Sequence, residues 1–322
     1  MTAFSESEVR TLVVGVIALV IVGLLPFVDQ GYTLSLTVNI VLYAVLCTAW
    51  TLFSGPTHYI SLATAAFYGI GTYAVALGID VLPFPLLVAM GAIVAGLVAG
   101  LVGIATLRLS GVYFVIFTLG LAELVRQVVT WLQTQFGSSL GLYVLTDLRE
   151  GHILWMLLGL AVIVYVVGWL INRSRLGFAM RIIGNDETVA RHAGIDTALA
   201  KVILFVISGA IIGAVGAIMA PRYSYITAPS AFNAMISFQV VIMALLGGTN
   251  KLWGPLVGVI PFTLLFDQVG ARFPNHTSLV VGIAFMAIVY LLPRGVLGLL
   301  DDFNRARKQF RLVADATGKP AP

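Results

Sequence analysis

Two ionisable side chains stand inside one apolar run of the sequence, and their spacing lets them act together. Glu123 and Arg126 lie well within the run 112–132. Residues three apart share one face of a helix, so this carboxylate and guanidinium can pair. Charges inside a membrane are costly and usually face the bundle interior or water. The pair therefore has two interpretations: part of a translocation path or proton relay, or a self-neutralising ion pair that fixes the packing of neighbouring helices.

One formal match to a catalytic motif occurs at 137–141, where the residues satisfy the G-x-S-x-G pattern. In a hydrolase this motif turns from a strand into a helix and exposes its serine, here Ser139. The flanks in this chain are an apolar run and a polar loop, which favours a flexible connection. An intramembrane hydrolase that uses Ser139 remains an alternative hypothesis.

No other residue pattern points to catalysis or to a cofactor. The four histidines are scattered, no H-E-x-x-H motif occurs, and Cys47 is the single cysteine. The G-x-x-x-x-G-K-[ST] motif is missing, so the chain has no P-loop for the phosphates of ATP. We therefore expect no metal site, no cofactor site and no catalytic residues in this chain.

The composition places these residues in a membrane protein. Of the 322 residues, 60% are hydrophobic and 10% are charged, whereas a soluble domain has about 25% charged residues. So few charges cannot cover a surface in water, which excludes a soluble enzyme, a disordered protein and a nucleic-acid binder. The net charge of +4 is typical of the Lys and Arg excess that membrane proteins carry on their cytoplasmic side.

Ten apolar segments are candidates for membrane helices: 11–28, 34–53, 60–77, 86–107, 112–132, 153–171, 202–219, 236–246, 255–266 and 277–292. Helix is favoured over strand because an open strand would leave its backbone unpaired in lipid. Segment 60–77 is rich in small residues, and 236–246 and 255–266 are short. These three are either broken or re-entrant helices, or ordinary helices whose ends are placed too tightly. The prediction is an all-α polytopic bundle of about 8–10 spans, with one transmembrane domain over 1–293.

The distribution of basic residues predicts the orientation. With a cytoplasmic N-terminus and ten crossings, 14 of the 18 Lys and Arg residues fall on the cytoplasmic side and three fall outside. This split follows the positive-inside rule, so both termini are predicted to be cytoplasmic. Residues 294–322 form a basic tail, predicted to begin as a helix on the inner membrane surface and to end in a frayed segment.

The polar interval 172–201 has the residue order of a short helix. Asn185 can cap it, Glu187 stands in its first turn, and Gly194 can end it in a left-handed turn. Asp196 can then cap the next membrane helix. The predicted element is a helix of about eight residues, roughly 12 Å long. Fixed to a membrane helix at the cytoplasmic face, it could transmit force from a soluble partner; an ordinary connecting loop is the alternative.

This stretch resembles a known motif. The sequence GNDETVARHAGI at 184–195, followed by Lys201 and an apolar helix, is similar to the "EAA" coupling loop of ABC importer permeases. Glu187, Ala190 and Gly194 match the pattern, whereas Thr188 and Val189 stand where small residues are more usual.

Four further stretches resemble the branched-chain (hydrophobic) amino acid permease family, and its M-type subunit in particular. They are SLATAAFYGIGTY at 61–73, TLGLAELVR at 118–126, LGGTNKLWGP at 246–255 and PRGVLG at 293–298. The five matches keep the family's order along the chain, which makes them specific as a set.

The resemblance implies one half of the translocation pathway of an importer that works by alternating access. It implies a second homologous permease subunit, two cytoplasmic ATPases that bind ATP and Mg²⁺, and an extracytoplasmic solute-binding protein. It also implies that Glu187, Ala190, Arg191 and Gly194 couple the membrane helices to an ATPase. The expected location is the plasma (inner) membrane of a prokaryote, with lipid around the chain and no nucleic acid bound.

The transported solute is the least determined part of this prediction. Branched-chain amino acids are the commonest assignment in the family, and urea, amides and aromatic acids are alternatives. A proton-coupled secondary transporter that uses Glu123 as its proton site, without an ATPase, is a separate alternative.

Overall fold

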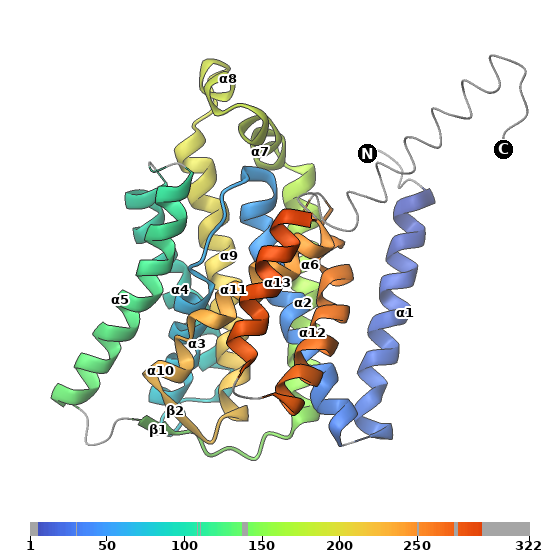
Figure 1. Cartoon of the computed structure of the whole chain (residues 1–322), viewed down its shortest axis with the longest axis vertical. Helices are drawn as coiled ribbons and strands as arrows, with labels where there is room; N and C mark the ends of the chain where they lie inside the picture. Colours follow the sequence, from blue (N-terminus) through green and yellow to red (C-terminus); the bar gives the residue numbers. More distant parts are fainter. Residues whose placement is uncertain are drawn as a thin grey trace, which may run out of the picture.

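The computed structural model describes residues 6–29, 31–107, 109, 111–136, 141–249, 251–273 and 276–291. Long helices run side by side through the body, two helices (α7 and α8) project at one end, and a small sheet lies at the other (Figure 1). The helices are α1 (Glu6–Val28), α2 (Tyr32–Thr57), α3 (Thr64–Gly78), α4 (Phe84–Thr106), α5 (Val112–Phe136), α6 (Glu150–Arg173), α7 (Arg175–Asn185), α8 (Glu187–His192), α9 (Thr197–Met219), α10 (Ala228–Ala231), α11 (Ala234–Gly247), α12 (Gly254–Arg272) and α13 (Thr277–Leu291).

The prediction of an all-α polytopic membrane protein is confirmed. Each of the ten predicted segments overlaps a helix, and seven of the helices in the described residues are long and apolar enough to cross a membrane. The short segment 255–266 belongs to the 19-residue α12. Segment 236–246 belongs to α11, which with α10 forms a candidate span of 20 residues over Ala228–Gly247. Ends placed too tightly explain the shortness of segment 255–266, whereas α11 has only 14 residues and is separated from α10 by the non-helical Phe232 and Asn233.

The broken segment is 60–77, whose first residues are not helical. Helix α2 ends at Thr57, where His58 takes a left-handed conformation with φ 58°. The chain then runs without helix from the α7 end of α2 back into the bundle, and the 15-residue α3 begins at Thr64 (Figure 1). Non-helical backbone at this depth is tolerated where protein covers it.

Small residues let α4 and α9 approach closely. A Cβ atom added to Gly209 would lie 2.6 Å from the Cβ of Ala99, and one added to Gly213 would lie 2.4 Å from the Cβ of Ala95. Both distances are too short for a real contact, so only glycine fits at these two positions. Close approach of this kind is the usual source of helix association in lipid, where the hydrophobic drive is weak.

At the end of the bundle far from α8, Arg222, which follows α9, forms polar contacts with α2 and with the start of α6. Its guanidinium donates to Asn39 Oδ1 at 2.6 Å and to Ser35 Oγ at 2.5 Å, both on α2. It also lies 3.3 Å from Glu150 Oε1 at the start of α6. These bonds hold the region after α9 against the first turns of α2 and α6.

The two-stranded antiparallel sheet at this same end pairs β1 (Gly141–Tyr143) with β2 (Tyr225–Thr227), in the register Leu142 to Ile226. It was not predicted from the sequence. Gly141, the last residue of the G-x-S-x-G match, begins β1. Ser139 lies outside the described residues, so the structure does not test the hydrolase hypothesis. The basic tail 294–322 also lies outside them.

Candidate functional site

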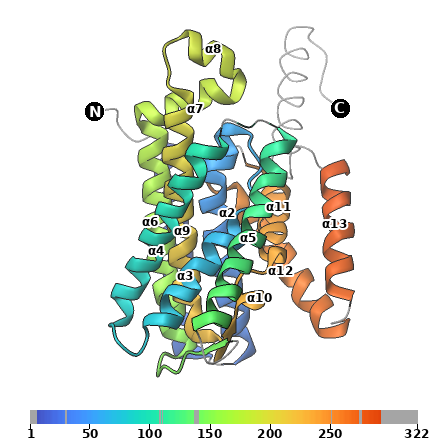
Figure 2. The same cartoon turned by 90° about the vertical axis from the view of Figure 1, so that its left-hand side faces the viewer.

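The polar interval 172–201 contains two helices, α7 and α8; α7 packs against the end of the bundle and α8 lies beyond it (Figure 2). Ser174 caps α7, its hydroxyl accepting from the backbone N–H of Gly177 at 3.4 Å. Helix α7 then crosses α2, where a Cβ on Gly184 would lie 2.2 Å from the carbonyl oxygen of Pro56. The prediction of a single short helix here was therefore incomplete.

Asp186, and not Asn185, caps the second helix. Asn185 is the last residue of α7, and the Asp186 Oδ1 accepts from the backbone N–H groups of Thr188 at 2.7 Å and Val189 at 3.2 Å. These backbone hydrogen bonds lower the pKa of Asp186, because they stabilise its ionised form. The predicted cap at Asn185 was wrong by one residue, and α8 has six residues where about eight were expected.

The end of α8 has the predicted geometry. Gly194 takes φ +79°, its N–H donates to the Arg191 carbonyl at 3.0 Å, and the Ile195 N–H donates to the Ala190 carbonyl at 3.1 Å. This pair of bonds is a Schellman motif, which needs a left-handed residue at the position of Gly194. Asp196 then caps α9 by accepting from the Leu199 N–H at 3.0 Å, so the chain reverses tightly between α8 and α9.

Glu187 is the centre of a polar network beneath α8. One carboxylate oxygen, Oε1, accepts from Lys201 Nζ at 2.9 Å, from the Arg191 guanidinium at 2.7 Å and from the Thr197 hydroxyl at 3.2 Å. The other, Oε2, accepts from the Tyr59 hydroxyl at 3.0 Å. Lys201 is only 1% exposed, so this is an ion pair with one partner fully buried.

The Lys201 ammonium connects α8 to the membrane helices. Besides Glu187, it donates to the Leu107 carbonyl at 3.3 Å, just after α4, and to the Tyr59 hydroxyl at 3.4 Å. It also lies 4.6 Å from the centre of the Tyr59 ring. Lys201 itself belongs to α9, and Tyr59 to the non-helical segment 58–63. These contacts connect α8 to α9, to the end of α4 and to that segment.

Glu187 and Arg191 of this network were predicted from the sequence, whereas Tyr59 and Thr197 were not, and Lys201 was identified only as a residue that follows the motif. Of the other two predicted residues, Ala190 is buried on the inner side of α8, and Gly194 is exposed in the turn between α8 and α9. A lysine near the start of an otherwise apolar helix was the available signal, because a buried ammonium needs an anionic partner.

We expect the stability supplied by the Glu187 carboxylate to be lost only in strong acid. Burial acts to raise the pKa of Glu187, but hydrogen bonds from Lys201 and Arg191 outweigh it and lower the pKa from 4.5 to about 2. A carboxylate with a lowered pKa stabilises the folded state fully above its unfolded value, and this stability disappears as pH falls through the folded value. The difference in unfolding midpoint between the wild type and Glu187→Gln should thus be constant above pH 4.5 and shrink between pH 4.5 and 2. A difference that changes near neutral pH would contradict this assignment.

A second group of polar contacts holds the chain where α3 begins. The Thr118 hydroxyl of α5 accepts from the Leu62 N–H at 3.0 Å. The Ser237 hydroxyl of α11 donates to the Leu62 carbonyl at 2.8 Å and accepts from the Ala65 N–H at 2.9 Å. The Trp50 indole of α2 donates to the Ser61 carbonyl at 2.7 Å. Side chains from three helices thus replace the missing helical hydrogen bonds.

The predicted pairing of Glu123 with Arg126 is present on α5. Arg126 Nε donates to Glu123 Oε2 at 2.9 Å, a second guanidinium nitrogen also contacts this carboxylate, and the Gln127 amide donates to it at 2.8 Å. Among the described residues, the hydrogen bonds of the pair stay on α5, so it does not tie neighbouring helices together. The carboxylate side chain is 55% exposed on the surface of the chain.

The fold is that of a multi-pass membrane protein, and comparison with known families identifies the chain as a transport subunit rather than a catalytic enzyme. A family model described as "Branched-chain amino acid transport system / permease component" matches residues 32–290. The chain belongs to this family, and it is a multi-pass protein of the inner membrane.

Individual relatives agree with this assignment. The chain is 24% identical over 331 aligned residues to the High-affinity branched-chain amino acid transport system permease protein LivM of Escherichia coli (strain K12), an alignment that covers 92% of this chain and 77% of LivM. It is 26% identical over 147 residues to the permease protein LivH of the same organism, covering 45% of this chain and 46% of LivH. No solved structure matches the chain significantly.

Proposed function

We propose that the chain is one of two permease subunits of an ABC importer for branched-chain amino acids, and that α8 is the element on which an ATPase acts. The family match over residues 32–290 carries the first part of this proposal. The buried ion pair between Glu187 and Lys201 carries the second, because it joins an exposed helix to the transmembrane body.

The exposed surface of α8 fits a protein partner. Thr188, Val189, Arg191 and His192 are exposed, whereas Ala190 faces inward. The exposed apolar side chain of Val189 beside the cation of Arg191 gives the partner both a packing and a charged contact. A six-residue helix held at both ends by caps moves as a rigid unit, which suits it to transmit force.

In the proposed mechanism, two separate ATPases bind ATP and Mg²⁺ and close against the cytoplasmic face. Their closure moves α8, and the ion pair carries this movement to α9 and to the segment 58–63. The membrane helices then open outward and accept solute from an extracytoplasmic binding protein, and hydrolysis returns them to the inward state. The basic face with α7 and α8 is cytoplasmic in this scheme, as the positive-inside rule predicts.

A proton-coupled secondary transporter is less well supported. Its proton site would be Glu123, but Arg126 lies 2.9 Å from this carboxylate and stabilises its ionised form. A carboxylate held in this state is a poor proton carrier.

Reconstitution in liposomes tests the proposed function. Leucine uptake should require ATP, the second permease, both ATPases and the binding protein, and it should stop when any of them is omitted. Competition by urea, an aliphatic amide and an aromatic acid identifies the solute class. Uptake by this chain alone, driven only by a pH gradient, would contradict the importer and favour the secondary transporter.

A further inference from the structure

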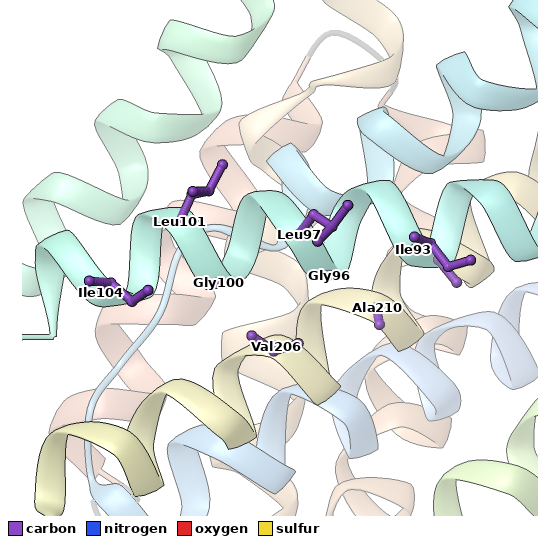
Figure 3. A pocket seen from close by; sticks show the side chains of 9 residues that line it. Ile93, Gly96, Leu97, Gly100, Leu101, Ile104, Val206 and Ala210 are labelled. Carbon is purple, nitrogen blue, oxygen red and sulfur yellow. The ribbon is translucent and has the colours of Figure 1, made fainter.

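The outward faces of the peripheral helices differ in chemistry. On α4, the side chains of Ile93, Leu97 and Leu101 point away from the body. With Gly96 of α4 and Val206 of α9, these side chains line an open groove of about 430 Å³ between the two helices, and all of its lining residues are apolar (Figure 3). Such a surface matches lipid hydrocarbon and needs no protein partner.

Helix α6 has the same character on its outer face. Val162, Ile163, Val166 and Leu170 are exposed there, and none of them carries a polar group. The outward faces of α4 and α6 therefore define what a lipid-facing surface looks like in this protein.

The outward face of α5 is different. Glu123 and Gln127 are exposed on it, and Arg126 is 31% exposed. Glu123 is the twelfth of the 25 residues of α5, so it lies about 17 Å from one end of the helix and about 20 Å from the other. The charged group thus stands close to the middle of the membrane.

A charge at this depth cannot face hydrocarbon at low cost. Charged residues at the centre of a membrane helix are costly to insert, and they almost always face protein or water. Pairing with Arg126 reduces this cost, but within the described part of the chain the hydrogen bonds of this carboxylate come only from Arg126 and Gln127, both on α5. This part of α5 needs a polar covering.

The remainder of the face suits a packed helix interface. Phe117, Leu124 and Trp131 are exposed on it, and a Cβ atom added to Gly120 would meet nothing within 4 Å. The small residue allows another helix to approach closely, and the large apolar and aromatic side chains around it can pack against that helix. Both views place α5 at the periphery of the bundle, where a neighbour can reach it (Figures 1 and 2).

We propose that the α5 face formed by Phe117, Gly120, Glu123, Leu124 and Gln127 contacts the second permease subunit, a chain different from this one. This inference rests on the proposed importer and adds the surface at which its two membrane subunits meet. The partner's polar groups cover the Glu123–Arg126 pair, so the pair lies at the seam between the subunits, near mid-membrane.

Spin labels compare this face with a lipid-facing one at similar depth. In a Cys47→Ala background, which removes the single native cysteine, Leu124→Cys on α5 is paired with the control Leu97→Cys on α4. These leucines are 58% and 63% exposed in the isolated chain. In the complete importer in nanodiscs, we expect oxygen accessibility at position 124 to be several-fold lower than at position 97. Equal accessibility, or high accessibility of position 124 to a water-soluble nickel chelate, would overturn the contact.

A photoactivatable crosslinker on Leu124→Cys identifies the occupant. An adduct with the second permease supports the proposal, whereas an adduct with another copy of this chain, or with lipid alone, overturns it. Leucine uptake by the same labelled importer is measured in parallel. Uptake with a lipid-facing α5 would defeat only this inference, whereas loss of ATP dependence would defeat the proposed function.

Discussion

Replacing Glu187 with alanine is expected to destabilise the protein by about 3–5 kcal/mol, the usual cost of removing one partner from a buried ion pair. In the wild type Lys201 is 1% exposed, and the variant leaves its ammonium beside the Tyr59 ring with two hydrogen-bond acceptors, the Tyr59 hydroxyl at 3.4 Å and the Leu107 carbonyl at 3.3 Å. Neither group carries the negative charge that compensates a buried cation. Thermal unfolding of the purified protein in detergent measures the effect.

The double variant Glu187→Ala with Lys201→Met separates stability from coupling. Methionine has a similar length and no charge, so the double variant should recover most of the lost stability. Transport should not recover, because the side-chain contacts of Glu187 with Lys201 of α9 and with Tyr59 are lost. A double variant that restores leucine uptake per ATP hydrolysed to the wild-type value would show that the ion pair is structural only.

Replacing Gly194 with valine is expected to uncouple ATP hydrolysis from transport. Gly194 has φ +79°, and an L-residue in the left-handed region costs about 1–2 kcal/mol, with β-branched residues the least tolerant. A Cβ at this position would meet nothing within 4 Å, so the strain comes from the backbone and not from a clash. The turn between α8 and α9 should therefore open, and uptake per ATP hydrolysed should fall severalfold in proteoliposomes.

Gly194→Asn is the matched control for this variant. Asparagine adds a side chain of comparable size but tolerates the left-handed conformation, so its uptake should stay near that of the wild type. If valine and asparagine reduce uptake equally, the surface at position 194, rather than the backbone geometry of the turn, is what matters.

Much of the fold can be predicted from local sequence patterns. Apolar runs of about 20 residues must form helices in lipid, because only helices satisfy their own backbone there. Gly194 and Asp196 predict the turn between α8 and α9 from local preferences: glycine favours the left-handed conformation, and aspartate favours the N-cap of a helix. The error at Asn185 is equally local: two neighbouring residues could cap the helix, and the choice of Asp186 depends on how far α7 extends.

The contacts that build the site are long-range and were harder to foresee. Tyr59 and Glu187 are 128 residues apart, and their meeting depends on how α2 and α9 pack. In the sequence, Thr118 and Ser237 are indistinguishable from other polar residues in apolar helices. Their role is apparent only when the break before α3 places backbone groups beside them.

The break between α2 and α3 also changes what governs the position of α3. Helical backbone advances 1.5 Å and turns about 100° per residue, whereas extended backbone can advance about 3.3 Å per residue. The six residues 58–63 can therefore reach up to about 20 Å, where a helix of the same length would cover about 9 Å. Adding or deleting one of them shifts the depth of α3 without the fixed rotation that the same change imposes inside a helix. The depth of α3 therefore depends on this short segment and on the hydrogen bonds that hold it to α2, α5 and α11, and not on a helical continuation of α2.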